Sequence, residues 1–157
     1  MKPTSIRLLA ILAIVGIAGG WALAVVVAGW TGRSLPLPVL AGAALWLLTI
    51  GLFAWGALVR PRILARQQPR PGVTAMPSLQ AARVAALAMA AARMGAIVAG
   101  AYLGIAMATL AEGLSTPAAE QALWSALLAA TGAAGTSAVS IWIERACVLS
   151  VGEEKDE

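Results

Sequence analysis

Four long stretches without a charged residue dominate the chain. They run over Leu8–Ala28, Val39–Val59, Met94–Ala111 and Ala122–Ile143, and they hold between 18 and 22 residues each. At about 1.5 Å per residue, a helix of roughly this length crosses the ~30 Å hydrocarbon core of a bilayer. The pattern predicts an all-α membrane protein with helices over about 7–29, 38–59, 79–111 and 118–144.

Helix-breaking residues separate these stretches. The turn at 29–37 holds Gly29, Gly32 and Pro36, and the turn at 112–121 holds Gly113 and Pro117. Glycine and proline in such clusters end helices, and a short connection favours antiparallel neighbours. We therefore expect a four-helix bundle made of two hairpins.

The two predicted hairpins are joined by a longer basic loop at 60–77, which contains four prolines. We expect residues 1–151 to form a single transmembrane domain and residues 152–157 a charged flexible tail. The start of the loop has two open interpretations, a short helix at the lipid headgroups or a solvated loop.

Composition supports the bilayer as the solvent. The chain is 61% apolar and 11% charged, whereas soluble domains are nearer half apolar and a quarter charged. The net charge of +4 comes from basic residues that lie beside apolar stretches. Membrane topology explains that placement better than a nucleic-acid surface does, so the expected partner is the lipid bilayer and no nucleic acid is expected.

The basic residues predict the orientation of the chain. Four arginines lie in the predicted loop, at Arg60, Arg62, Arg66 and Arg70, and Arg83 follows near the start of the third predicted helix. With four spans, this interval shares one side with both termini and their four Lys and Arg residues. The opposite side holds Arg33 alone. The positive-inside rule then places both termini and this interval in the cytoplasm.

The first predicted helix also resembles a secretion signal at one point. Ala22-Leu23-Ala24 has the small-x-small pattern of a cleavage site. However, the apolar stretch continues through Val25 to Val27, and signal peptides have apolar regions of only about 7–15 residues. A retained helix is the preferred interpretation.

Small residues recur every four positions on two predicted helices. The first helix carries Gly16 and Gly20, and the third carries Gly100 and Gly104. Residues at i and i+4 share a face, and small ones let a second helix approach closely. Such faces serve either packing within the monomer or binding to a membrane-protein partner or a second copy.

Arg93 and Glu144 are the two candidate functional or structural charges. Arg93 precedes the third uncharged stretch, and Glu144 follows the fourth. A charge inside the membrane is a candidate functional group, whereas an arginine near the boundary reaches the headgroups with its long side chain. If Arg93 lies deeper, Glu144 is its best candidate partner.

Catalytic chemistry has few candidates in this chain. It has no histidine and one cysteine, Cys147. That composition removes the commonest general base and metal ligand. We expect no enzyme, no cofactor and no metal. A lipid-active enzyme would have to rely on Glu144 and Cys147.

Several segments resemble an uncharacterised bacterial membrane family, domain of unknown function 3180. They are Lys2-Pro3-Thr4, Ser78 to Arg83, Leu87 to Ala90, Gly95-Ala96 and Trp142 to Cys147. The resemblance covers essentially the whole chain. It implies a small actinobacterial protein with four transmembrane helices and no established activity.

Taken together, the residues predict a non-catalytic accessory or scaffold protein that packs against other membrane helices through its small-residue faces. The alternative is a small transporter or channel subunit. This alternative is less favoured because the first two predicted spans offer no ionisable residue for proton coupling.

Overall fold

A computed structural model describes residues 5–32, 37–64 and 78–152 of the 157-residue chain. These residues form four helices: α1 (Ile6–Thr31), α2 (Val39–Leu64), α3 (Ser78–Glu112) and α4 (Pro117–Gly152). The described part contains no strand. The all-α prediction and the number of helices are confirmed.

The helix ends follow local sequence signals. Ser5 caps α1 by accepting a hydrogen bond from the Leu8 amide at 3.4 Å, and Gly32 ends α1 with a φ of 63°. That left-handed conformation suits glycine because it has no Cβ. At α4, the Thr116 hydroxyl accepts from the Ala119 amide at 3.2 Å, with Pro117 as the first helical residue. Proline is favoured there because its missing N–H costs nothing.

Two helices are longer than the uncharged stretches predict. The second helix does not stop before Pro61 but continues to Leu64. A proline near a helix end removes one hydrogen bond, and the last turn survives that loss. The fourth helix runs on to Gly152. Arg66, Arg70 and the tail residues 153–157 lie outside the described residues.

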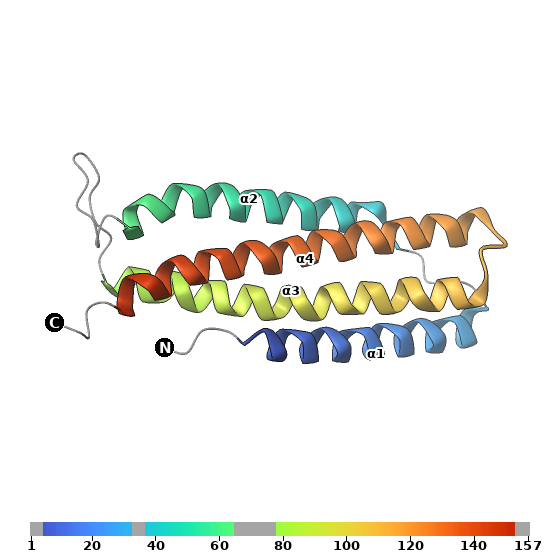
Figure 1. Cartoon of the computed structure of the whole chain (residues 1–157). Coiled ribbons are helices and arrows are strands. Elements are labelled where there is room, and N and C mark those ends of the chain that lie inside the picture. The colour runs from blue at the N-terminus through green and yellow to red at the C-terminus, as the bar shows by residue number, and fades with distance from the viewer. Residues whose placement is uncertain (1–4, 33–36, 65–77, 153–157) are drawn as a thin grey trace.

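The helices lie side by side in the order α1, α3, α4, α2 (Figure 1). We call the end of this row that carries Ser5 and Gly152 the terminal end, and the end that carries Gly32 and Pro117 the distal end. Because the chain runs back and forth, α1 is parallel to α3, and α2 is parallel to α4.

One predicted detail is wrong: α1 and α2 do not pack along each other. Their short connection makes them antiparallel, yet α3 and α4 lie between them (Figure 1). Instead, glycines on each of the outer two helices let it approach an inner helix closely, α1 on α3 and α2 on α4.

Candidate functional site

The glycines of the two predicted ladders lie in one interface, between α1 and α3. A Cβ added at Gly16 or Gly20 would collide with the backbone of Ile97 or Ala101. From the other side, a Cβ at Gly100 would meet the Ala13 carbonyl group. Gly104 is in the same position against Ile17 and Trp21. The ladder glycines therefore pack between α1 and α3 within the chain, and their faces are not available to a partner.

A second close interface joins α2 to α4. A Cβ at Gly42 would lie 3.2 Å from the Ala129 amide nitrogen, and one at Gly132 would lie 3.1 Å from the Leu45 Cβ. Gly56 meets the Ile143 side chain in the same way. These glycines form no four-residue ladder, and sequence reasoning missed them.

Thr49 links α2 to α4 by hydrogen bonding. Its hydroxyl oxygen lies 2.8 Å from the Gly132 carbonyl oxygen and 2.8 Å from the Thr136 hydroxyl oxygen. Thr49 is the only hydroxyl residue in the apolar stretch Val39–Val59. That isolation in an otherwise apolar helix was the available signal, since buried hydroxyls need partners.

The polar residues of α4 divide by partner. Ser137 donates to the Ala92 carbonyl oxygen of α3 at 3.0 Å and Thr136 bonds to Thr49 of α2, so both residues make interhelical hydrogen bonds. Thr131 bonds back to its own helix. The Ser140 hydroxyl is fully buried and has no hydrogen bond among the described residues.

Arg93 and Glu144, the two candidate charges, are not brought together. Arg93 is exposed on α3, while Glu144 is only 2% exposed on α4. The Ser137–Ala92 bond fixes the relative height of the two helices, and it leaves Arg93 and Glu144 about 12 Å apart along the axis. Both lie within the described residues, and no ion pair joins them.

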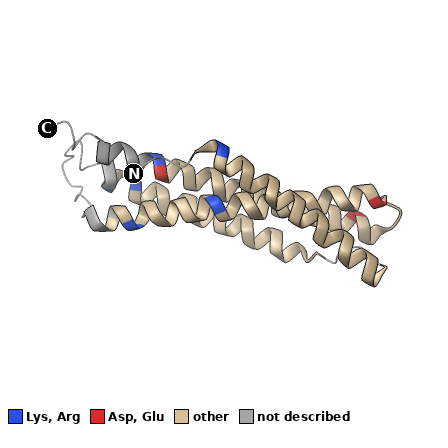
Figure 2. Cartoon of the chain, turned by 90° about the horizontal axis from the view of Figure 1, so that it is seen from below, with Lys and Arg blue, Asp and Glu red and all other residues tan. Residues whose placement is uncertain are grey.

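The described charges separate along the row. The basic residues gather toward the terminal end, where Glu144 also lies, while Glu112 and Glu120 lie at the distal end (Figure 2). The basic residues at the terminal end are Arg7, Arg60, Arg62, Arg83 and Arg145. Arg60 is held by an aromatic pair, because its guanidinium lies 4.9 Å from the Trp142 ring centroid and Trp142 stacks on Phe53.

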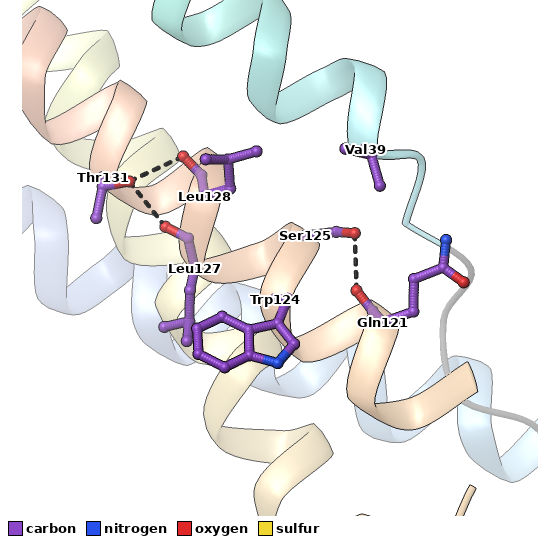
Figure 3. Close-up of a pocket in the computed structure, with 7 residues that line it drawn as sticks. All are labelled: Val39, Gln121, Trp124, Ser125, Leu127, Leu128 and Thr131. Carbon is purple, nitrogen blue, oxygen red and sulfur yellow. Dashed lines mark hydrogen bonds between the residues drawn. The ribbon is translucent and has the colours of Figure 1, made fainter. Parts of the chain in front are cut away.

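An open groove lies at the distal end between the start of α2 and α4 (Figure 3). Its volume is about 420 Å³, and its lining consists of Val39, Gln121, Trp124, Ser125, Leu127, Leu128 and Thr131. Among the described residues, no group of three potential metal ligands is present. The groove therefore offers shape and carbon surface rather than reactive groups.

All four helices are long and apolar enough to cross a membrane. Their back-and-forth threading defines a multi-pass membrane protein. Residues 9–150 match the model of a family described as a protein of unknown function, DUF3180, and the chain belongs to that family. No curated protein and no solved structure matches the chain.

Proposed function

We propose that the protein is a non-catalytic accessory subunit of the bacterial cytoplasmic membrane, which binds another integral membrane protein along the edges of its helix row. The observation that carries this proposal is the uneven burial of the helices. In an apolar 18-residue segment of each helix, 17% of the residues are buried in α1 and in α2, against 50% in α3 and 44% in α4. Each outer helix has one helical neighbour and a free opposite side.

The edges are apolar along their length. On α1, Ile14 and Val15 are 63% and 59% exposed, and on α2, Leu47 and Ile50 are 70% and 57% exposed. Lipid chains satisfy such surfaces, and so does a second transmembrane helix. An accessory role uses the second possibility, with the inner helices serving as the rigid support.

The orientation proposed with this role places the terminal end in the cytoplasm. The charge separation of Figure 2 supports it, since basic residues are enriched on the cytoplasmic side of membrane proteins. The α1–α2 and α3–α4 connections then lie outside the cytoplasm.

A photoreactive amino acid at Val15 or at Leu47, introduced in the native host, tests the proposed role. We expect each position to yield a discrete crosslink to one membrane protein that also co-purifies in a mild detergent. Met94 on the inner helix α3 is the control, because it is 61% exposed but does not lie on an edge helix. Crosslinks to lipid alone from both edges would contradict the proposal.

A second candidate function, a small transporter or channel subunit, is favoured by the burial of Glu144. A carboxyl group that is 2% exposed in a membrane-spanning helix is a candidate carrier of protons. Ser140 and Thr136 continue its face of α4 toward the middle of the helix, at spacings of four residues.

Proteoliposomes with an imposed pH gradient distinguish this candidate. Proton-coupled leakage should be faster with the wild-type protein than with Glu144→Gln or with empty liposomes. Equal rates in all three would exclude a proton path through Glu144.

A further inference from the structure

The groove between α2 and α4 is lined by carbon although three of its seven residues are polar. The Ser125 hydroxyl donates to the Gln121 carbonyl oxygen at 2.7 Å. The Thr131 hydroxyl lies 3.0 Å from the carbonyl oxygens of both Leu127 and Leu128. Both hydroxyl protons are thus directed to their own helix (Figure 3). What remains for a ligand is the surface of Val39, Leu127, Leu128 and Trp124.

The groove ends where the two helices come into contact, first at Gly42, where a Cβ would lie 3.2 Å from the Ala129 amide nitrogen, and then at Gly132. At Gly132, a Cβ would lie 3.1 Å from the Leu45 Cβ and 3.2 Å from the Trp46 backbone nitrogen. No space remains between α2 and α4 at that level. The described lining residues of α4 run from Gln121 to Thr131, a distance of ten helical steps or about 15 Å.

This length matches one leaflet of a membrane. The hydrocarbon core is about 30 Å thick, so each leaflet contributes about 15 Å of acyl chain. A transmembrane helix of a partner would need a groove along the whole thickness, and this groove closes halfway. Its closed end at Thr131 lies in the middle of the bilayer, and its open end lies at the distal boundary.

The open end carries the polar groups that an amphipathic ligand needs. The exposed Gln121 side chain lies there beside Val39, and the Trp124 indole, 71% exposed, lies one turn further in (Figure 3). Tryptophan is enriched at this depth because its ring is apolar and its N–H donates. Among the described residues, no charged side chain lines the groove.

We propose that this groove binds one acyl chain of a phospholipid from the leaflet at the distal end. The lipid is held in place there, unlike the exchanging lipids around the outer surface. The inference rests on the membrane location of the helices and not on the proposed accessory role, so either can fail without the other.

Two tryptophan substitutions test the groove. Val39→Trp places an indole into the groove from the α2 side, whereas Leu40→Trp adds the same group at the next position, which is 79% exposed and does not line the groove. The protein is purified from membranes of phosphatidylethanolamine and phosphatidylglycerol, and bound lipid is counted by native mass spectrometry. We expect the lipid-bound fraction to fall about tenfold or more in Val39→Trp and to be unchanged in Leu40→Trp.

Melting curves of both variants in detergent show whether the fold is retained. A Val39→Trp variant that melts like the wild type and keeps its lipid would overturn the proposal. If Val39→Trp melts early, a photoreactive residue at the exposed Thr131 decides instead. A mass increase of one phospholipid supports the proposal, and a crosslink to a second copy or to another protein contradicts it.

Discussion

A single added methyl group separates two kinds of glycine in this chain. At Gly16, a Cβ would meet the Ile97 carbonyl oxygen and lie 3.0 Å from the Ala101 amide nitrogen, while at Gly19 nothing lies within 4 Å. Both glycines are in the middle of α1, so both carry the same backbone entropy cost. Only one of them is required by the close approach of α3.

This contrast predicts opposite effects of the same substitution. Gly16→Ala should destabilise the protein by about 1–3 kcal/mol, because backbone atoms cannot move aside as a flexible side chain does. Gly19→Ala should be neutral or stabilise by up to about 1 kcal/mol through its better helix propensity. Thermal unfolding in detergent measures both. Equal melting temperatures for the two variants would contradict the close contact between α1 and α3.

Thr49 offers a second test at the scale of one side chain. Thr49→Val keeps the shape but removes the hydroxyl that bonds to Gly132 and Thr136 across the α2–α4 interface. Interhelical hydrogen bonds in membrane proteins contribute about 0.6 kcal/mol on average and up to about 1.7. We expect a loss in the upper part of that range, with Thr49→Ser as the control that retains the hydroxyl. A double-mutant cycle with Thr136→Val isolates the pair, and additive losses would show that the two hydroxyls do not interact.

At the scale of the helices, the order α1, α3, α4, α2 follows from which faces are small rather than from which helices are consecutive. Parallel packing brings position 49 against position 136, a separation of 87 residues. The same separation joins Ala13 to Gly100 and Gly56 to Ile143. The first hairpin therefore lies in parallel register along the second, with its own two helices held apart.

Cysteine crosslinking tests this order. Ala24 and Ala108 are buried in one cluster between α1 and α3. In a Cys147→Ala background, the pair Ala24→Cys and Ala108→Cys should form a disulfide on mild oxidation. Ala44 on α2 lies at a similar distance from the α1–α2 connection, so Ala24→Cys with Ala44→Cys is the matched control. If the control pair formed the disulfide and the first pair did not, α1 would pack against α2, and the helix order given above would be wrong.

Much of the fold could be predicted from local signals, and its assembly could not. Uncharged stretches locate the helices, and Thr116 with Pro117 locates the start of α4. The ladder at Gly16 and Gly100 identifies two faces that permit close approach, but a small-residue face fits many others. The groove escaped prediction because it forms where the start of α2 meets α4, which depends on two helices that are distant in sequence.

At the scale of the whole molecule, the charged residues are distributed unevenly along the long axis of the helix row. Basic residues gather at the terminal end and Glu112 and Glu120 lie at the distal end (Figure 2). Moving this chain through a bilayer in the opposite sense would carry several arginines across it. Each charged side chain costs about 2.5–3.5 kcal/mol in the middle of a membrane-spanning helix.

Labelling with a membrane-impermeant maleimide tests the orientation. In a Cys147→Ala background, Ser115→Cys in the α3–α4 connection should react in intact spheroplasts. Gln80→Cys, in the first turn of α3, should react only after the membrane is opened. Both positions are exposed, so accessibility of the thiol is comparable. Reaction of Gln80→Cys in intact cells would reverse the proposed orientation.

The separation of α1 from α2 has a consequence for biogenesis. These two helices leave the ribosome first, but the surfaces that hold them belong to helices not yet made. Until α3 and α4 enter between them, the first half of the protein has no stable contact of its own. A chain truncated after Leu64 should be degraded rapidly. The first half of the protein therefore depends on the second half for its helix contacts. The cell's insertion machinery must hold α1 and α2 in the membrane until α3 and α4 have been inserted.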